Sequence, residues 1–125
     1  MISVLPVKDK EKVKMFFEKQ NYEFNENSGC VAAMDGDEVL GKCLYYLYEN
    51  GITILSVEPH NDLMLADGIL RSALHVAAQR SAMDARYQDK AYEVLFEKLD
   101  FIKDKEEKAL DIDKLFGGCN CHKSI

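Results

Sequence analysis

An Asp-Gly pair in the segment DLMLADGILRSALHVAAQR, residues 62–80, is a candidate anion-binding helix start. The pair Asp67-Gly68 precedes a run with helical periodicity and follows an apolar segment, so it predicts a helix that begins near residue 67. Free N–H groups and the dipole at such a start bind phosphate groups. Asp67 can instead cap its own helix, because its carboxylate would accept hydrogen bonds from the same N–H groups. The sequence favours the cap and leaves the anion site open.

The segment CNCH, residues 119–122, is a second group with chemical potential. Thiolate and imidazole are ligands that zinc and copper(I) favour, and Cys119, Cys121 and His122 would supply three of them. A structural zinc ion normally takes four ligands at wider spacing, so the fourth would come from Cys30, Cys43 or a second chain. We therefore expect residues 117–125 to form a flexible tail, with zinc binding or thiol chemistry as the alternatives.

The composition limits the classes of partner. The chain has 125 residues, 47% of them hydrophobic, and a net charge of −6. This length predicts one domain, and an acidic chain without a basic run is not expected to bind nucleic acid. No apolar run reaches membrane-spanning length, and Lys8 and Lys10 come too early for a signal peptide, so we expect a cytoplasmic protein that does not enter a membrane.

The elements that must position these residues alternate between strands and helices. Asp35-Gly36 and Asn50-Gly51 suit tight hairpin turns, which predicts three consecutive antiparallel strands over 30–34, 38–48 and 52–57. Strand 52–57 and a later strand, 82–87, are joined by a helix at about 67–81, so they should run parallel. The remaining elements are a strand over 2–7, a helix over 9–20, a helix over 90–101 and a strand over 107–112. The class is α/β with a mixed twisted sheet, in the order β-α-β-β-β-α-β-α-β, over residues 1–116.

This order and two local motifs resemble the GNAT N-acetyltransferase superfamily. The first is SVEP followed by GILRSAL, which is similar to a strand ending in Val-x-Pro and the acyl-CoA loop Q/R-x-x-G-x-G/A. The second is AYEVLFEKLDF, residues 91–101, which is similar to the late motif A-x-x-L-Y-E-K-L-G-F. The resemblance covers about residues 2–112.

The resemblance implies a fold in which the two parallel strands splay apart and hold the pantetheine arm of acetyl-CoA. The pyrophosphate would rest on the loop that enters the helix. The backbone N–H near Val57 would polarise the thioester carbonyl. The coenzyme-binding residues that the resemblance implies are Val57, Gly68, Ile69, Arg71 and Ser72.

The implied activity is acetyl transfer from acetyl-CoA to a small-molecule or peptide amine. Because strand 52–57 contains no titratable side chain, Glu58 is the candidate base, acting through a water, and Tyr92 is the candidate acid, with Tyr87 as an alternative. Departures from the motifs are Leu65 for Gln or Arg, Leu70 for Gly or Ala, Phe96 for Tyr and Asp100 for Gly.

Two other classes of function keep the same fold. One is a non-catalytic module that binds a ligand in the cleft or senses metal or thiol chemistry through the Cys-x-Cys-His tail. The other is an interaction protein, which would form a homodimer through a sheet edge.

Overall fold

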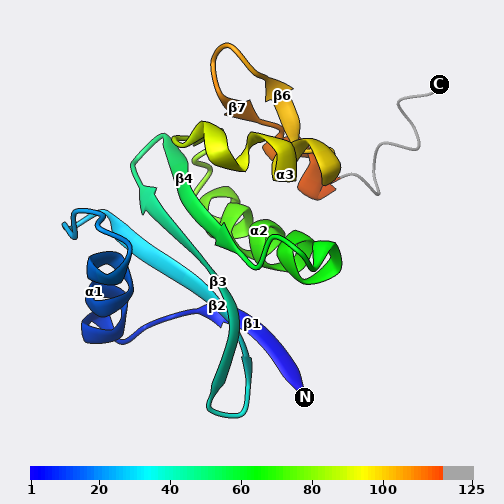
Figure 1. Cartoon of the computed structure of the whole chain (residues 1–125). Helices are drawn as coiled ribbons and strands as arrows, with labels where there is room; N and C mark the ends of the chain where they lie inside the picture. The colour runs from blue at the N-terminus through cyan, green and yellow to red at the C-terminus, as the bar shows by residue number, and fades with distance from the viewer. Residues whose placement is uncertain (117–125) are drawn as a thin grey trace.

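A seven-stranded mixed sheet organises the chain in the computed structural model, which describes residues 1–116 (Figure 1). The strands lie in the order β1-β2-β3-β4-β5-β7-β6. The expected α/β class with a mixed sheet is confirmed. In chain order the strands are β1 (Ile2–Pro6), β2 (Ser28–Asp35), β3 (Glu38–Leu47), β4 (Gly51–Glu58), β5 (Asp84–Tyr87), β6 (Ile102–Asp104) and β7 (Ala109–Leu110). The helices are α1 (Lys10–Lys19), α2 (Leu63–Ala78), the 3-10 turn η1 (Lys90–Tyr92) and α3 (Glu93–Lys98).

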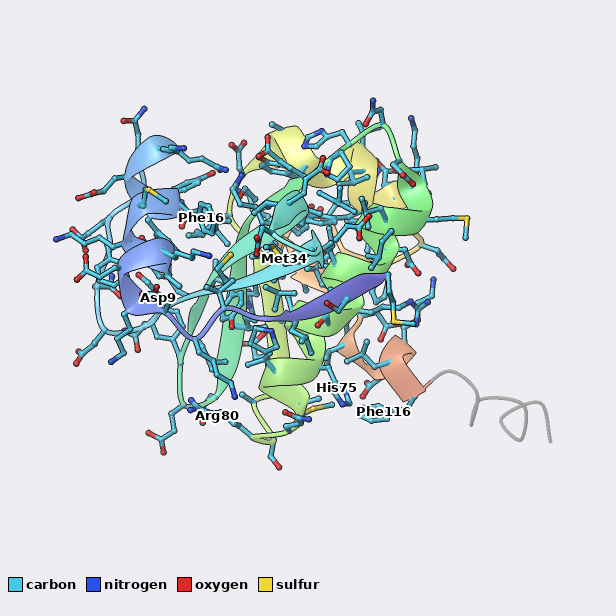
Figure 2. The ribbon with its side chains drawn as sticks, turned by 90° about the horizontal axis from the view of Figure 1, so that it is seen from below. Asp9, Phe16, Met34, His75, Arg80 and Phe116 are labelled. Carbon is cyan, nitrogen blue, oxygen red and sulfur yellow. The ribbon has the colours of Figure 1, made fainter. Side chains whose placement is uncertain are left out.

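Helices cover both faces of this sheet, with α1 on one side and α2 on the other (Figure 2). The α1 helix begins as expected at Asp9, whose side chain accepts a hydrogen bond from the backbone N–H of Glu11. Its buried residues Val13 and Phe17 pack on the α1 face of the sheet. The larger core lies on the α2 face and includes residues of α2, α3 and the central strands. None of the helices in residues 1–116 is long and apolar enough to cross a membrane.

The three antiparallel strands of the hairpins are confirmed, with ends within two residues of those expected. Gly36 has φ +62°, the left-handed conformation that a tight turn needs and that glycine adopts without strain. Gly51 has a different role, because a Cβ there would lie 2.1 Å from the carbonyl oxygen of Asp84 on β5. Glycine at this position therefore lets β4 and β5 pair at the start of β4.

Two helix predictions need correction. The α2 helix begins at Leu63 rather than near residue 67, because Asp62 is its N-cap and accepts a hydrogen bond from the N–H of Leu65 at 3.1 Å. The segment Leu-Met-Leu-Ala that follows Asp62 has high helix propensity and fills the first turn. The expected single helix over 90–101 is divided into η1 and α3, and Val94 on α3 is 60% exposed.

The C-terminal strands also differ from expectation. The predicted strand over 107–112 is reduced to β7, which pairs with β5 on one side and with β6 on the other. We did not predict β6, because its three residues follow the late motif directly and show no alternation long enough to indicate a strand. Residues 112–116 form a 3-10 turn.

The contrast between Gly51 and Gly68 gives a test of the fold. We predict that Gly51→Ala lowers the free energy of unfolding by about 1–3 kcal/mol, because its Cβ would meet backbone atoms that cannot move aside. Gly68 lies in α2 with nothing within 4 Å of an added Cβ. Gly68→Ala should therefore raise the free energy of unfolding by about 0.5–1 kcal/mol. Urea denaturation of both variants measures this; equal effects would contradict the β4–β5 register.

Candidate functional site

The parallel strands β4 and β5 separate part-way along their length. They pair from Gly51 opposite Asp84 to Ile54 opposite Tyr87. The last backbone hydrogen bond between them runs from the N–H of Gln88 to the carbonyl of Ile54, at 3.1 Å. Beyond it β4 continues to Glu58, while the chain after β5 turns into η1. The parallel direction is therefore as the sequence predicted, and the divergence is as the resemblance implied. We call the unpaired stretch between the two segments the slot.

A β-bulge at Leu55 determines which backbone groups face this slot. Opposite β3, the register moves from Tyr45–Ile54 to Leu44–Ser56, so Leu55 is the extra residue. Successive residues of β3 direct their backbone groups alternately to β2 and to β4, and Leu44 directs its groups to β4. Leu44 and Ser56 are therefore a hydrogen-bonded pair, so Ser56 directs its backbone groups to β3. Val57 directs its N–H to the other side, where no strand of residues 1–116 pairs with it. The expected donor near Val57 is thus oriented toward the slot, and the whole residue, backbone included, is buried.

Two tyrosines and a glutamate surround the open end of the slot. The Tyr22 hydroxyl donates to the carbonyl oxygen of Leu55 at 3.1 Å and so holds the bulge from the α1 side. The ring of Tyr92 packs at 4.8 Å from that of His60 and 6.3 Å from that of Phe96. Glu58 ends β4 on the face that α1 covers. The two candidate catalytic residues, Glu58 and Tyr92, therefore lie at the same end of the slot.

The electrostatics of this region are dominated by burial and by carboxylates. Burial raises the pKa of Tyr92 to about 12, with further increases from Tyr22, Glu58 and Asp89. Burial, Asp89 and Glu58 also raise the pKa of Tyr22. Both phenols are consequently protonated at neutral pH and can donate hydrogen bonds or protons.

The Glu58 carboxylate has partners on both flanking elements. Its Oε1 accepts from Nε2 of Gln20 at 3.2 Å and lies 3.3 Å from Nζ of Lys42. The side chain is 49% exposed, so water reaches it. A carboxylate held in place but wetted in this way is suited to take a proton through a water molecule.

Ser56 is fully buried, and it is the one residue of 1–116 whose buried side-chain N or O atom has no hydrogen-bond partner there. Leaving such a group unsatisfied costs about 1–3 kcal/mol. It stands on β4 beside the bulge, where the pairing with β5 has already ended. Sequence reasoning missed both Ser56 and Tyr22. The signal for Ser56 was available, since it is one of two hydroxyls in an otherwise apolar strand; the loop position of Tyr22 gave none.

The first turn of α2 borders a groove of about 1040 Å³ on the α2 side of the sheet. The N–H of Leu65 is used by Asp62, whereas those of Leu63 and Met64 have no acceptor within residues 1–116. No lysine or arginine lines the groove, so any anion there would be held by backbone N–H groups and the side-chain amide of Asn61 rather than by a positive charge. The lining residues are Ile2, Leu40, Pro59, Asn61, Asp62, Leu63, Met64 and Leu65.

The expected coenzyme residues of α2 do not lie at the helix start. Gly68, Ile69, Arg71 and Ser72 follow Leu63 by more than one turn, so the premise that they form the first turn is wrong. Ile69 is fully buried against the sheet. Leu70 is also fully buried, so its bulk does not obstruct the groove.

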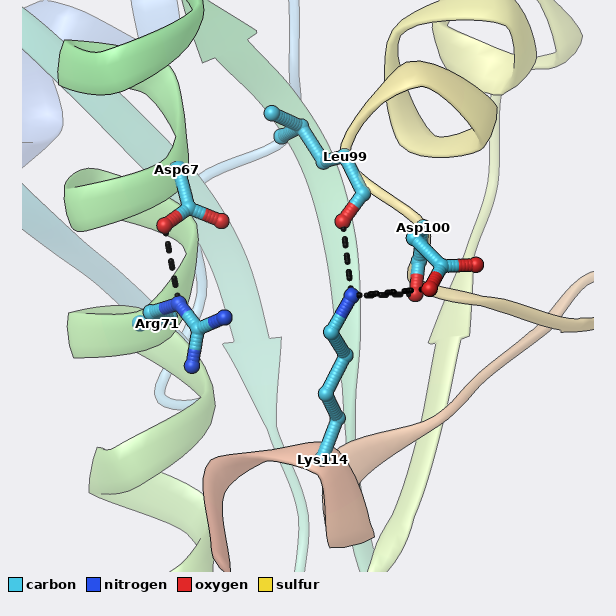
Figure 3. A network of polar contacts seen from close by, with 5 residues as sticks. All are labelled: Asp67, Arg71, Leu99, Asp100 and Lys114. Atoms are coloured by element: carbon cyan, nitrogen blue, oxygen red, sulfur yellow. Dashed lines mark hydrogen bonds and ion pairs between the residues drawn. The ribbon is translucent and has the colours of Figure 1, made fainter. Parts of the chain in front are cut away.

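Arg71 belongs to a network on the side of α2 that faces Leu99, Asp100 and Lys114 (Figure 3). Its Nε donates to Oδ2 of Asp67 at 2.8 Å, and its guanidinium lies 5.1 Å from the centre of the Phe101 ring. Asp67 therefore pairs with Arg71 one turn away and is not the N-cap. Nζ of Lys114 lies over the same ring and donates to the carbonyls of Leu99 and Asp100.

The late motif forms a closed helix end at its two changed residues, Phe96 and Asp100. Asp100, in the position of the motif glycine, has φ +62° and follows the C-cap of α3. The N–H of Phe101 donates to the carbonyl of Phe96 at 2.9 Å, which closes the helix end. Phe96, in the position of the motif tyrosine, is fully buried and packs 5.3 Å from the Tyr87 ring. The hydroxyl of Tyr87 donates to Glu93 and that of Tyr22 to the Leu55 carbonyl, which leaves Tyr92 as the phenol of the three whose hydroxyl is not committed to such a bond within residues 1–116.

Zinc binding receives no support from residues 1–116, which contain no cluster of three His, Cys, Asp or Glu residues suited to a metal. Cys30 and Cys43 are buried in the cores on opposite faces of the sheet, so neither is placed to complete a shared site. Burial raises the pKa of the Cys30 thiol to about 12 and that of Cys43 well above its usual range. The predicted ligands Cys119, Cys121 and His122 lie outside the residues that the structure describes.

Comparisons with known proteins agree with this topology at the level of the fold. No family model and no curated protein sequence matches the chain. Among solved structures, it is similar to an aminoglycoside acetyltransferase, meta-AAC0020, from an uncultured soil metagenomic sample, at TM-score 0.58 and 11% identity over 83% of this chain and 88% of that one.

Two further solved structures are similar to this chain in fold. The integron cassette protein VCH_CASS6 from the mobile metagenome of V. cholerae has TM-score 0.57 and 11% identity, over 82% of this chain and 85% of that one. The AtaT Y144F toxin, bound to the C-terminus of the antitoxin AtaR, has TM-score 0.57 and 13% identity, over 93% of this chain and 97% of that one. The chain therefore has a GNAT-like fold.

The corrected helix start can be tested by removing each aspartate. We predict that Asp62→Ala lowers the free energy of unfolding by about 0.5–2 kcal/mol, because it removes the N-cap of α2. Asp67→Ala removes only a partly exposed i,i+4 pair with Arg71 and should change stability by about 0.5 kcal/mol or less. Thermal denaturation of the two variants, compared at the same pH and salt, decides between them. A larger loss for Asp67→Ala would place the helix start at residue 67 after all.

Proposed function

We propose that the chain is an N-acetyltransferase that transfers an acetyl group from acetyl-CoA to a small-molecule or peptide amine. The observation that carries this proposal is the Val57 N–H, which faces the slot between β4 and β5 without a strand partner among residues 1–116. An extended amide-bearing chain such as pantetheine can complete the sheet at this edge. The GNAT-like fold supports the same reaction class.

Acetyl-CoA would contact two parts of the chain, the edge of β4 and the first turn of α2. The pantetheine arm lies along β4 with its thioester carbonyl toward the Val57 N–H, which would stabilise the developing oxyanion. The phosphates lie at the first turn of α2, where the N–H groups of Leu63 and Met64 are free of partners within residues 1–116. Because no basic side chain lines this groove, we expect a modest affinity for the phosphate portion.

Acid and base at the open end would complete the reaction. Glu58 removes a proton from the acceptor amine through a water, and the amine nitrogen attacks the thioester carbon. Tyr92 then donates its proton to the departing sulfur, in place of the tyrosine that Phe96 replaces. Tyr92 lies one helical turn before Phe96 in the chain and shares the same aromatic cluster.

Acetyl-CoA binding is the first test. At about 100 times its dissociation constant, acetyl-CoA should stabilise the folded chain by about 2.7 kcal/mol in a thermal-shift or urea experiment. Val57 and the first turn of α2 provide the contacts for this effect. A chain that acetyl-CoA does not stabilise at any concentration would contradict the proposal.

Turnover is the second test. Release of free thiol in the presence of amines should fall by about 100-fold or more in Tyr92→Phe and in Glu58→Gln, since each removes a proton-transfer group. Tyr87→Phe is the matched control, because its hydroxyl is already bonded to Glu93, and it should keep most of the activity. Stabilisation by acetyl-CoA without thiol release with any amine would favour the non-catalytic ligand-binding alternative.

A pH profile separates the two roles. The pKa of Tyr92 is raised to about 12, so its acidic form persists through the working range and is lost only above it. We therefore predict that kcat shows no alkaline decline below pH ~10. A decline centred near pH 8 that Tyr92→Phe abolishes would contradict the assigned acid.

A further inference from the structure

Ser56 is the side chain of the slot that neither packing nor the proposed reaction has yet explained. It is completely buried, yet its hydroxyl oxygen has no hydrogen-bond partner among residues 1–116. Its neighbours in β4, Leu55 and Val57, are apolar and fully buried. If this position only filled the core, alanine would give a more stable fold than serine, because alanine leaves no polar group unsatisfied. The hydroxyl therefore requires a reason beyond packing.

The surroundings of Ser56 point to Tyr92. The Ser56 hydroxyl is close enough to the Tyr92 phenol to lower the pKa of that phenol, although the pair does not meet hydrogen-bond geometry in this state. Tyr92 packs against the core that β4 contributes to. It belongs to η1, a 3-10 turn of three residues with its N-cap at Asp89, rather than to the body of α3.

We propose that Ser56 is a positioning residue for Tyr92, donating a hydrogen bond to the phenol oxygen while the phenol proton passes to the leaving sulfur. This inference rests on the proposed function and adds to it the group that stabilises the phenolate. The bulge at Leu55 is what places Ser56 beside the slot, because it moves the alternation of β4 by one residue. The hydrogen bond that Ser56 lacks before reaction is thus formed when charge develops on the phenol oxygen.

The step balances without an added reactant. The amine nitrogen forms a bond to the acetyl carbon and loses one proton to Glu58 through water. The carbon–sulfur bond breaks, the sulfur keeps the electron pair, and it takes the proton of Tyr92. The phenolate is held by the Ser56 O–H until a proton from solvent restores the phenol, and the products are the amide and the free thiol of CoA.

A double-mutant cycle tests the inference with the full chain, acetyl-CoA and an accepted amine. Ser56→Ala should lower kcat by about tenfold, leave KM for acetyl-CoA within about twofold, and not lower the midpoint of thermal unfolding. Because Ser56 acts through Tyr92, the double variant Ser56→Ala with Tyr92→Phe should be no slower than Tyr92→Phe alone. Ser56→Cys, which keeps the shape and weakens the donor, should have an intermediate kcat.

Ser3→Ala is the matched control, because Ser3 lies on β1 at the far edge of the same sheet, and it should leave kcat unchanged. Additive effects of the Ser56 and Tyr92 substitutions, or a Ser56→Ala variant with full kcat, would overturn the inference while leaving the proposed function in place. A Ser56→Ala variant that unfolds at lower temperature with an unchanged kcat would show a structural role instead. A wild-type chain that binds acetyl-CoA and acetylates no amine would overturn both.

Discussion

The end of strand pairing between β4 and β5 is the constraint on which the other features of the site depend. A parallel pair that continued to Glu58 would use the Val57 N–H within the sheet and leave no room for a ligand. Pairing stops after Ile54 because β5 is only four residues long and the chain turns into η1 behind the capping Asp89. The bulge at Leu55, held by the Tyr22 hydroxyl, then rotates the backbone so that Val57 rather than Ser56 faces the slot. The short β5 strand and the bulge at Leu55 thus leave an unpaired edge on β4, to which a ligand could bind.

The sequence could predict the order and direction of the central elements because their patterns are strong and unopposed. Each pattern indicates one structure: Asp-Gly and Asn-Gly indicate hairpin turns, the apolar run 52–57 indicates a strand, and the amphipathic run of α1 indicates a helix. All of these elements are found within a few residues of the expected place. The start of α2 was misplaced because two aspartates, Asp62 and Asp67, each precede a helical run, and only the folded chain determines which one caps. Asp67 pairs with Arg71 inside the helix, so Asp62 alone serves as the N-cap.

The site was predicted less well than the fold, for a physical reason. Glu58 could be proposed because it follows a predicted strand, and Tyr92 because it lies at the start of the late motif. The bulge that orients Val57 has no sequence signal, because the extra residue, Leu55, is as apolar as its neighbours. Ser56 and Tyr22 gain their significance only from this bulge. The motif changes were also misleading, since Leu70 is buried in the core and Asp100 adopts the left-handed conformation of the glycine it replaces.

The exchange rate of the Val57 amide proton tests the central claim most directly. Before ligand is added, this proton should exchange with solvent faster than the amide protons of Ser56 and Glu58, which face β3. Saturation with acetyl-CoA should slow its exchange and shift its resonance, with smaller effects at Leu63 and Met64. A Val57 proton that is already as protected as its neighbours, or that acetyl-CoA leaves unchanged while other residues respond, would contradict the account.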